Sequence, residues 1–452
     1  MDLKDRNLLV MGAGISGVAV AKVAKNLGAC VTVSDHKPLE NLGAIPDMLA
    51  KAGIMLTTGI QSETLLQNID MIIPSPGVSI YHPLLQLAIQ QGIEVISEVE
   101  FAFRLTAAPF IAITGTNGKT TTTTLISEMI KKAGRRLVVG GNIGIPLSEA
   151  VYNQTEDTFV VAEISSFQLE GVRQFRPYAC AILNLTPDHI DRHGTVAVYR
   201  EMKERIFAKQ RADDYVILNY DDEQVREMAK HAPSHVIFFS STQMLAEGAF
   251  LRDGYLTISL GGREQTICAV REMGIRGGHN VQNALAACAL AKVCDVSVEV
   301  MAETLRSFKG VEHRLEFVNE QQGVKYYNDS KATNPESSIV ALQAFIEPVV
   351  LIAGGRDKGT DLGSFMKEIK KHVRKLILVG EAADRFEQAA KDHAITEIHR
   401  AESFKDAVSL AANLAQPGES VLLSPACASY DMFNNYEERG RSFKQLVIEL
   451  RR

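Results

Sequence analysis

The sequence has no CxxC motif and no regular spacing of cysteines. Its six cysteines lie at positions 30, 180, 268, 288, 294 and 427. Zinc sites and disulfide-stapled domains are typically marked by closely spaced or evenly repeated cysteines. We therefore expect neither kind of site, and we expect the protein in a reducing cytoplasm.

An excess of positive charge is also absent. The chain carries 48 Lys and Arg against 54 Asp and Glu, so its formal net charge is -6. General nucleic-acid binding needs clustered basic residues that neutralise phosphates. We expect no nucleic-acid partner, although small anionic ligands need only local positive groups.

No apolar stretch is both long and uninterrupted. Residues 8–21 are apolar and follow basic residues, as in a signal peptide, but glycines interrupt them and favour a strand–turn–helix. Residues 71–93 carry no formal charge, yet prolines prevent a single spanning helix. We expect no targeting segment and no membrane association.

The sequence does contain many short apolar runs that alternate with helical patterns. Its 452 residues, 46% of them apolar and 23% charged, are too many for one core and correspond to about three globular domains. Strand–helix alternation predicts parallel sheets. The predicted strands are 8–11, 31–34, 71–74, 94–97, 110–114, 158–163, 179–185, 215–219, 349–353, 376–379 and 421–423.

Turn motifs predict a smaller antiparallel part. Residues 249–269 have Asp-Gly and Gly-Gly turns, as expected of a three-stranded meander, and residues 314–328 form a predicted hairpin around Gly323. Helices are predicted at 280–294 and 298–307, with a linker at Lys309-Gly310.

A glycine-rich motif, Gly12-Ala-Gly14-Ile-Ser-Gly17, lies between the first strand and a helix. Such glycines let backbone N–H groups approach a diphosphate at the helix N-terminus. Asp35 ends the next strand, where an acid can bind a ribose hydroxyl. Taken alone, this motif favours an NAD-dependent oxidoreductase, but it indicates a diphosphate without identifying the nucleotide.

A second loop, residues 115–121 (GTNGKTT), follows the strand 110–114 directly. It has Ile113 where the strict phosphate-loop pattern has its first glycine. The remaining glycines still allow N–H groups to point inward, Lys119 can reach terminal phosphates, and Thr120 can bind Mg²⁺. We predict an ATP-binding loop.

Polar residues follow two strands beside this loop. Glu163 ends the strand 158–163, and Asp188-His189 follows the strand 179–185. Two such groups next to a phosphate loop predict a magnesium site. Lys203, on the helix that follows, reads by itself as a surface lysine.

The last third of the chain has three polar loops at predicted strand ends. Arg314 can stack on a base or clamp a carboxylate, and Asp329 can hold a ribose. Thr333, Lys358 and Ser429 together suggest a small dicarboxylate ligand, because ligands of open α/β sheets bind at the carboxyl ends of strands. These loops span 328–335, 354–358 and 424–431.

These observations predict an α/β fold of three domains. The first, 1–97, is Rossmann-like. The second, 98–310, is a phosphate-loop ATPase-type domain with a mainly parallel sheet and a small antiparallel sheet. The third, 311–452, is again Rossmann-like.

Over essentially its whole length, the sequence resembles the Mur ligase family. The loop 115–120 occurs throughout that family. Three intact runs are similar to the branch that adds D-glutamate, and in this branch the first glycine-rich motif binds UDP instead of NAD. The runs are 163–169, 328–334 and 424–429.

The resemblance implies two small-molecule partners, UDP-N-acetylmuramoyl-L-alanine and D-glutamate. The UDP-sugar would contact Gly14, Ile15, Ser16, Asp35, Lys37, Ser75, Gly77, Asn142, Ser165 and Gln168. D-Glutamate would contact Thr333, Lys358, Ser429 and Tyr436, where the family often has Phe. We expect a monomer.

The resemblance also implies ATP and Mg²⁺ at two sites. ATP would contact Gly115, Thr116, Asn117, Gly118, Lys119, Thr120, Thr121, Asn283, Arg314 and Asp329. Thr120 and Glu163 would bind one Mg²⁺, and His189 and Lys203 a second. Lys203 matches a lysine that the family carries as a carbamate, which requires a neutral amine and hence a depressed pKa. The implied catalytic residues are Lys119, Glu163, His189 and Lys203.

Three alternatives remain open at this point. A nicotinamide-dependent oxidoreductase leaves the 115–121 loop unexplained. A nucleotide-gated binding protein would hydrolyse ATP only to change shape. A sister ligase would add another amino acid, or glutamate to folate.

Overall fold

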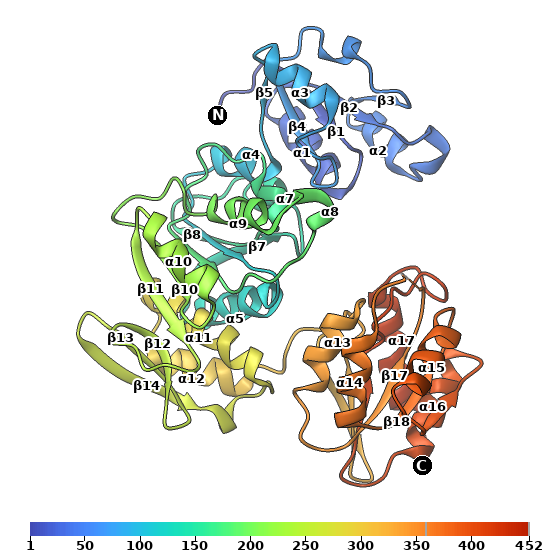
Figure 1. The fold of residues 1–452 in the computed structure, drawn as a ribbon. Helices are drawn as coiled ribbons and strands as arrows, with labels where there is room; N and C mark the ends of the chain where they lie inside the picture. The colour runs from blue at the N-terminus through green and yellow to red at the C-terminus, as the bar shows by residue number, and fades with distance from the viewer. Residues whose placement is uncertain (358, 451–452) are drawn as a thin grey trace. The chain divides into compact units, whose positions relative to one another are not determined.

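The structure is a computed structural model that describes residues 1–357 and 359–450 (Figure 1). The chain forms two compact units. The first comprises Met1–Glu272 and Gln282–Arg306, and the second comprises Met273–Val281 and Ser307–Arg452.

The first unit begins with a five-stranded parallel sheet of order β3-β2-β1-β4-β5. The strand order changes direction between β1 and β4, so the carboxyl ends of these two strands border a crevice where ligands of such sheets bind. The strands are β1 (Asn7–Met11), β2 (Cys30–Asp35), β3 (Met55–Thr58), β4 (Met71–Pro74) and β5 (Glu94–Val95), and the helices are α1 (Ile15–Asn26), α2 (Ile45–Lys51), α3 (Pro83–Gln90) and α4 (Glu98–Leu105).

A nine-stranded sheet follows in the same unit, with the order β14-β13-β12-β11-β10-β9-β6-β8-β7. Its strands are β6 (Phe110–Thr114), β7 (Arg136–Gly141), β8 (Thr158–Glu163), β9 (Ala179–Ile182), β10 (Tyr215–Asn219), β11 (His235–Ser240), β12 (Gly248–Arg252), β13 (Tyr255–Leu260) and β14 (Arg263–Ala269). The strands from β7 to β12 are parallel, and β13 and β14 continue the sheet in antiparallel pairing. The β6 strand lies between β8 and β9, which places its carboxyl end beside theirs.

Helices accompany this second sheet. They are α5 (Lys119–Lys132), α6 (Leu147–Ala150), α7 (Ser166–Leu169), α8 (Ile190–His193), α9 (Val196–Glu204), α10 (Glu223–Glu227), α11 (Gly278–Val293) and α12 (Val298–Ser307). The fully buried strands β6, β8 and β9 read as continuous apolar runs because parallel strands are covered on both faces.

The second unit contains a six-stranded sheet of order β15-β16-β20-β17-β18-β19, in which only the β15–β16 hairpin is antiparallel. The strands are β15 (Glu316–Gln321), β16 (Val324–Asn328), β17 (Val349–Ala353), β18 (Val373–Leu378), β19 (Ile398–Arg400) and β20 (Ser420–Leu423). The helices are α13 (Pro335–Leu342), α14 (Gly363–His372), α15 (Ala383–Asp392), α16 (Phe404–Leu414) and α17 (Tyr436–Glu449).

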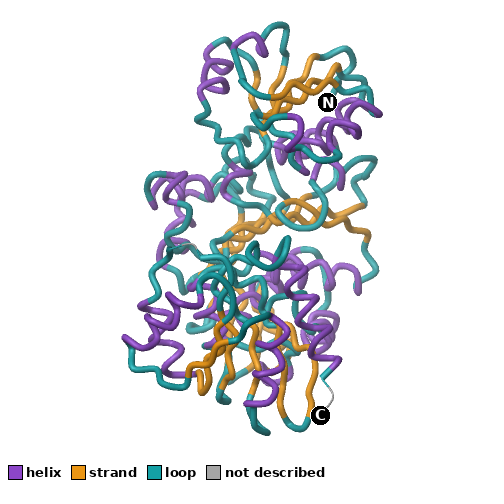
Figure 2. The backbone as a smooth tube through the Cα atoms, turned by 90° about the vertical axis from the view of Figure 1, so that its right-hand side faces the viewer, coloured by secondary structure: helices purple, strands orange, loops and turns teal. Residues whose placement is uncertain are grey.

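Alternate side chains of β17 belong to two different cores of the second unit. Val350 and Ile352 pack in one buried cluster, whereas Leu351 and Ala353 pack in another. Successive side chains of a strand point to opposite faces, so both faces of this sheet are covered. Figure 2 shows the orange strands of the sheets flanked by purple helices.

The predicted fold class is confirmed. The antiparallel meander is present, and it extends the central parallel sheet. The predicted hairpin is present and turns at Gln322-Gly323. Four strands, β3, β7, β11 and β19, were not identified from the sequence, and β9 ends at Ile182, before the predicted residue 185.

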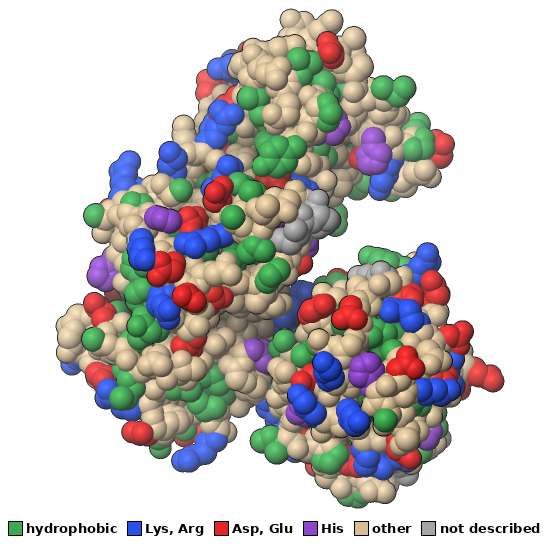
Figure 3. Space-filling view, in the orientation of Figure 1, with side chains coloured by type: hydrophobic (Ala, Val, Ile, Leu, Met, Phe, Trp, Pro, Cys, Tyr) green, Lys and Arg blue, Asp and Glu red, His purple; other side chains and the backbone are tan. Residues whose placement is uncertain are grey.

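The surface carries charges of both signs, and the cysteines are free thiols. Acidic and basic side chains intermingle on the face of the second unit seen in Figure 3. All six cysteines lie in the described part of the chain and are free thiols, with only Cys30 exposed. Among the described helices, none is long and apolar enough to cross a membrane.

Candidate active site

The predicted phosphate loop connects β6 to α5, as the sequence indicated. Gly118 is the residue before α5 and has φ 85°, a left-handed conformation that favours glycine. A Cβ atom at Gly118 would lie 2.2 Å from Oδ1 of Asn283. Asn283, a predicted ATP contact, is therefore packed directly against the loop, and a larger residue at 118 would collide with it.

Side chains from the segment after β9 and from α9 hold this loop in place. The Asn117 N–H donates to Oδ1 of Asn184 at 2.8 Å, and the Asn184 amide donates back to the Asn117 carbonyl at 3.1 Å. The Thr116 and Tyr199 hydroxyls lie 3.2 Å apart. The sequence alone does not indicate the role of Asn184, because this role depends on the pairing of β6 with β9, which brings residue 184 beside the loop.

Lys119 curls back over the loop. Its ammonium group donates to the Gly115 and Thr116 carbonyls at 2.9 and 2.8 Å. The next two residues, Thr120 and Thr121, are buried in the first turn of α5, whose first turn contains no acidic residue. The exposed N–H groups and dipole of such a helix start favour an anion.

Glu163 ends β8 next to β6, where its backbone is in register with Ile113. Its side chain is 1% exposed. One carboxylate oxygen accepts a hydrogen bond from the Asn142 amide at 2.8 Å, while the other is buried without a hydrogen-bond partner among the described residues. A buried, unpaired carboxylate oxygen is costly, and it suits a hard cation such as Mg²⁺.

Lys203 is not a surface lysine, because only 1% of it is exposed. Its amine lies 3.5 Å from the Thr114 hydroxyl, at the end of β6, and 4.6 Å from the Tyr199 ring centre. Burial, reinforced by the nearby positive charge of Lys119, lowers the pKa of Lys203 well below its ordinary value, whereas Asp188 opposes this shift. The pKa shift favours a neutral, nucleophilic amine.

His189 lies in the segment between β9 and α8 and is half exposed. It has a positive φ of 54°. Its ring lies 4.7 Å from the ring of Phe167, and its Nε2 lies 3.5 Å from the Asp188 carboxylate.

The glycine-rich motif at the start of the chain borders a cavity of about 540 Å³. Every predicted UDP-sugar residue except Ser165 lines this cavity: Gly14, Ile15, Ser16, Asp35, Lys37, Ser75, Gly77, Asn142 and Gln168. Ser165 caps α7 and bonds to Gln168, so it supports the cavity wall through its neighbour.

Asp35 organises this cavity through backbone contacts. One carboxylate oxygen accepts a hydrogen bond from the Ala13 N–H at 2.7 Å, and the other accepts one from the Lys37 N–H at 2.9 Å. The acid thus fixes the glycine-rich turn and retains lone pairs for a ligand hydroxyl.

In the second unit, Asp329 is buried at the end of β16. Its carboxylate accepts hydrogen bonds from the Ser424 hydroxyl at 2.7 Å and from the Leu315 N–H at 3.2 Å. Burial raises the pKa of Asp329 to about 7, although Ser424 and the charge of Arg314 act in the opposite direction. The Arg314 Nε is buried and has no hydrogen-bond partner among the described residues.

Arg439 joins two of the three loops predicted to bind the dicarboxylate, 328–335 and 424–431. Its guanidinium group, 1% exposed, donates to the Ser330, Cys427 and Ala428 carbonyls and to the Ser330 hydroxyl. The Ser330 hydroxyl also donates to the Tyr436 carbonyl at 2.8 Å. These contacts fix the loop of Ser429 and the start of α17 beside the loop of Thr333. The predicted ligand Lys358 lies outside the described residues.

Three models of known protein domains match this chain, one over each of the three sheets. The model of the Mur ligase MurD-like N-terminal domain matches residues 6–97, that of the Mur ligase middle domain matches 113–291, and that of the Mur ligase glutamate ligase domain matches 313–427. The chain belongs to the Mur ligase family. As a Mur ligase it is an ATP-dependent enzyme that forms an amide bond, a reaction that uses ATP and Mg²⁺.

Two full-length relatives of this Mur ligase bear the same name. The chain is 48% identical over 454 residues to the UDP-N-acetylmuramoylalanine--D-glutamate ligase of Thermoanaerobacter sp. (strain X514), covering 100% of both chains. It is also 48% identical over 447 residues to the protein of that name from Desulfitobacterium hafniense (strain DSM 10664 / DCB-2), covering 99% of this chain and 98% of the relative.

Solved structures of more distant Mur ligases share the fold. The UDP-N-acetylmuramate-alanine ligase MurC of Thermotoga maritima matches with a TM-score of 0.61 at 20% identity, covering 98% of this chain and 99% of its own. A pseudomurein peptide ligase type C from Methanothermus fervidus matches with a TM-score of 0.61 at 18% identity, covering 99% and 100%.

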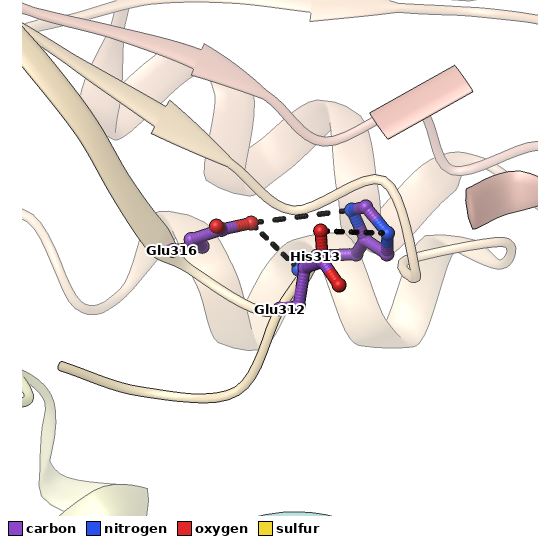
Figure 4. Close-up of side chains that lie close together, drawn as sticks. All are labelled: Glu312, His313 and Glu316. Carbon is purple, nitrogen blue, oxygen red and sulfur yellow. Dashed lines mark hydrogen bonds and ion pairs between the residues drawn. The ribbon is translucent and has the colours of Figure 1, made fainter. Parts of the chain in front are cut away.

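One further cluster of this Mur ligase has the composition of a metal site. Ligand atoms of Glu312, His313 and Glu316 lie within 4.8 Å of one another (Figure 4). However, the ammonium group of Lys444 donates to both glutamates, at 2.7 and 2.8 Å. A lysine therefore already supplies the positive charge between the two carboxylates, and we interpret the cluster as an ion-pair network that fastens α17 to the start of β15.

Proposed function

We propose that this Mur ligase joins D-glutamate to UDP-N-acetylmuramoyl-L-alanine, with ATP converted to ADP and phosphate, in the synthesis of the peptidoglycan precursor. The strongest support is the 48% identity over the full length to ligases named for this substrate pair. The cavity of about 540 Å³ beside a diphosphate-binding helix start offers a fitting place for the nucleotide sugar.

We propose that the cavity residues of the first sheet hold the UDP group. The start of α1 supplies N–H groups to the diphosphate, and its first turn contains no acidic residue to repel that charge. The exposed side chain of Ile15 and the paired Asp35 offer an apolar surface and a hydroxyl acceptor to the nucleoside. Asn142, directly after β7, and Gln168, in α7, line the same cavity, and the Asn142 amide also donates to Glu163.

We assign the ATP phosphates to residues 115–121 and the adenosine to Asn283, Arg314 and Asp329. Thr120 and Glu163 would hold one Mg²⁺, and His189 with carbamylated Lys203 would hold a second. When bound, these ions neutralise phosphate charge and align the reacting oxygens. The buried, unpaired oxygen of Glu163 and the depressed pKa of Lys203 support this assignment.

The chain's own residues determine the course of the reaction. The L-alanine carboxylate attacks the γ-phosphorus of ATP, and Lys119 with the loop N–H groups stabilises the charge that spreads over the phosphate oxygens. An acyl phosphate and ADP result. The amine of D-glutamate then attacks the acyl carbon and phosphate leaves.

We assign D-glutamate to Thr333, Lys358, Ser429 and the backbone near Tyr436. The contacts of Arg439 support this assignment, because they fix the loops of Ser429 and Thr333 and the start of α17 in one arrangement. A preorganised polar site of this kind binds a small dicarboxylate without a large ordering cost.

We also propose domain limits at 1–97, 98–310 and 311–452, and action as a cytoplasmic monomer. Each sheet lies within one of these ranges. The proposed contacts all come from one chain, so the chemistry needs no second copy.

A phosphate-release assay with UDP-N-acetylmuramoyl-L-alanine and ATP tests the proposal. We expect release with D-glutamate, and none with L-glutamate, D-aspartate or meso-diaminopimelate. Preference for diaminopimelate would indicate a sister ligase. ATP hydrolysis without amide product would indicate a nucleotide-driven switch. The Lys119→Ala variant should bind the UDP-sugar normally and form no ADP, and undiminished ADP formation would remove the phosphate-loop assignment.

A further inference from the structure

Arg192, a residue without an assigned role, joins two parts of the first unit that the reaction must keep aligned. It lies in α8, three positions after His189. Its guanidinium group donates to the Pro76 carbonyl at 3.0 Å and to the Val78 carbonyl at 3.3 Å. The same group forms a two-pronged ion pair with Glu170, at 2.9 and 2.7 Å.

These two carbonyls belong to the segment after β4 that lines the UDP-sugar cavity. Ser75, Pro76, Gly77 and Val78 all contribute to its wall. Glu170 also accepts a hydrogen bond from the Ile80 N–H at 3.4 Å. Both ends of the segment are therefore fastened to one arginine–glutamate pair, formed by Arg192 in α8 and by Glu170 directly after α7.

The pair is sheltered from water. The side chains of Arg192 and Glu170 are 13% and 4% exposed. At this depth, charge-assisted hydrogen bonds are stronger than on the surface and are little screened by salt. The planar guanidinium group can satisfy Glu170 and two carbonyls at once, whereas a lysine cannot reproduce that fork.

On its other side, Arg192 is linked to His189. The guanidinium carbon lies 4.2 Å above the Phe167 ring, and the same ring lies 4.7 Å from the His189 ring. The neighbouring His193 ring nitrogen lies 3.0 Å from the Ser166 hydroxyl. The segment that carries His189 is thus packed against α7 and, through Arg192, against the wall of the sugar cavity.

We propose that Arg192 is a positioning residue that fixes the UDP-sugar-binding segment 75–80 relative to the segment of His189. Arg192 itself is not among the residues that line the cavity. It aligns the cavity that holds the precursor with the side of the active site where its carboxylate is phosphorylated. This inference rests on the proposed function, because it assigns the cavity to the precursor.

The test compares the full-length wild type with Arg192→Lys, Glu170→Gln and the double variant. Arg200→Ala is the matched control, since Arg200 also forms an ion pair, with Glu204, but on α9 away from the cavity. Calorimetry measures UDP-N-acetylmuramoyl-L-alanine binding without ATP, and steady-state kinetics measure kcat and each KM. Thermal melting checks that each variant is folded.

We expect Arg192→Lys and Glu170→Gln each to weaken precursor binding about tenfold and to lower kcat, while the KM for ATP changes less than about twofold. The double variant should bind the precursor no more weakly than the single variant with the lower affinity, because both changes break one network. Arg200→Ala should behave like the wild type.

The inference would be overturned if Arg192→Lys bound the precursor with wild-type affinity. It would also be overturned if the losses of affinity were additive in the double variant, or if the KM values of all three substrates rose equally. If Arg192→Lys does not fold, Glu170→Gln decides the question alone. A wild type that binds the precursor but forms no product would refute the proposed function, and the binding comparison would still test Arg192.

Discussion

At the residue scale, Lys203 shows a conflict between stability and function. Its amine is buried with one long hydrogen bond to Thr114 and a contact with the Tyr199 ring. Because its pKa is lowered in the folded state, the unfolded chain binds more protons between the lowered pKa and the ordinary value of about 10.4. The free energy of unfolding of the wild type must therefore rise with pH across that window.

Replacing Lys203 with Met should remove this pH dependence. We expect Lys203→Met to be more stable than the wild type by about 1–2 kcal/mol near pH 7, because an apolar side chain has no buried charge to desolvate. It should form no ADP. Urea unfolding between about pH 6 and pH 9 in CO₂-free buffer measures the effect. Lys209→Met, at an exposed position, is the control, and a Lys203→Met variant less stable than wild type would contradict the argument.

Asp329 gives a pH dependence of stability opposite in sign to that of Lys203. Its folded pKa of about 7 lies above the ordinary value of 3.8, so the folded chain binds the extra proton and stability falls as pH rises between these values. We expect Asp329→Asn to lack this fall and to gain at most about 4 kcal/mol at pH 8 in the second unit.

The same Asp329→Asn variant should have a raised KM for ATP, because Asn cannot offer a carboxylate to the ribose. Melting curves from about pH 4 to pH 8 measure the stability effect. Asp392→Asn, on the exposed end of α15, should melt like the wild type. An unchanged pH dependence in Asp329→Asn would show that Asp329 is not the titrating group.

At the element scale, the strands that the sequence revealed differ from those it did not. The buried β6 and β8 read as uninterrupted apolar runs, because both of their faces are covered. By contrast, three of the four unidentified strands, β3, β7 and β19, lie at sheet edges, whereas the fourth, β11, lies between β10 and β12. These edge strands are short or half exposed. For example, β19 is only Ile398–Arg400, and β3 alternates exposed with half-buried residues. Edge strands lack the second neighbour that selects apolar residues.

The residues of the active site likewise fall into those that the sequence reveals and those that it does not. Residues within one loop, such as Gly118 and Lys119, were predictable because their chemistry depends on local spacing. Asn184, Arg192 and Arg439 were not, because each acts through contacts with distant segments, as Arg439 does with Ser330 across 109 positions. The burial of Lys203 likewise depends on how α9 packs, which its helical spacing alone does not reveal.

The hairpin between β15 and β16 permits an element-scale prediction. Its two turn residues, Gln322 and Gly323, have φ of 51° and 76°, as in the type I′ turns that suit strand twist. Asn tolerates a left-handed conformation better than Gln does. We expect Gln322→Asn to stabilise the second unit by about 0.5 kcal/mol without changing activity, since Asp329 follows the opposite end of β16.

Urea unfolding of the Gln322→Asn variant measures this gain. The control is Gln321→Asn, one position earlier in β15, where the backbone is extended and Asn is a poorer strand former. That variant should be no more stable than the wild type. A loss of stability in Gln322→Asn would mean that the Gln322 side chain has a packing role that outweighs the backbone preference.

At the scale of the whole molecule, the chain has two glycine-rich loops but uses only one for ATP in our proposal. Nicotinamide dinucleotides and UDP share the diphosphate that the Gly12–Gly17 loop can bind. The two kinds of ligand differ in the groups attached to that diphosphate. The cavity residues of the first unit come from both of its sheets, so a ligand that fills the cavity stabilises the first unit as a whole.

We therefore expect UDP alone to raise the unfolding free energy of the first unit and to leave that of the second unchanged. At about 100 times its Kd, the gain is about 2.7 kcal/mol. Scanning calorimetry measures the shift, and hydrogen exchange assigns it, with slower exchange at Gly14–Ser16 and Ser75–Gly77 and no change in β16 or β20. NAD at the same concentration is the control ligand and should shift neither unit. Stabilisation by NAD and not by UDP would return the first loop to the oxidoreductase interpretation, because linkage allows a ligand to stabilise only the state it binds.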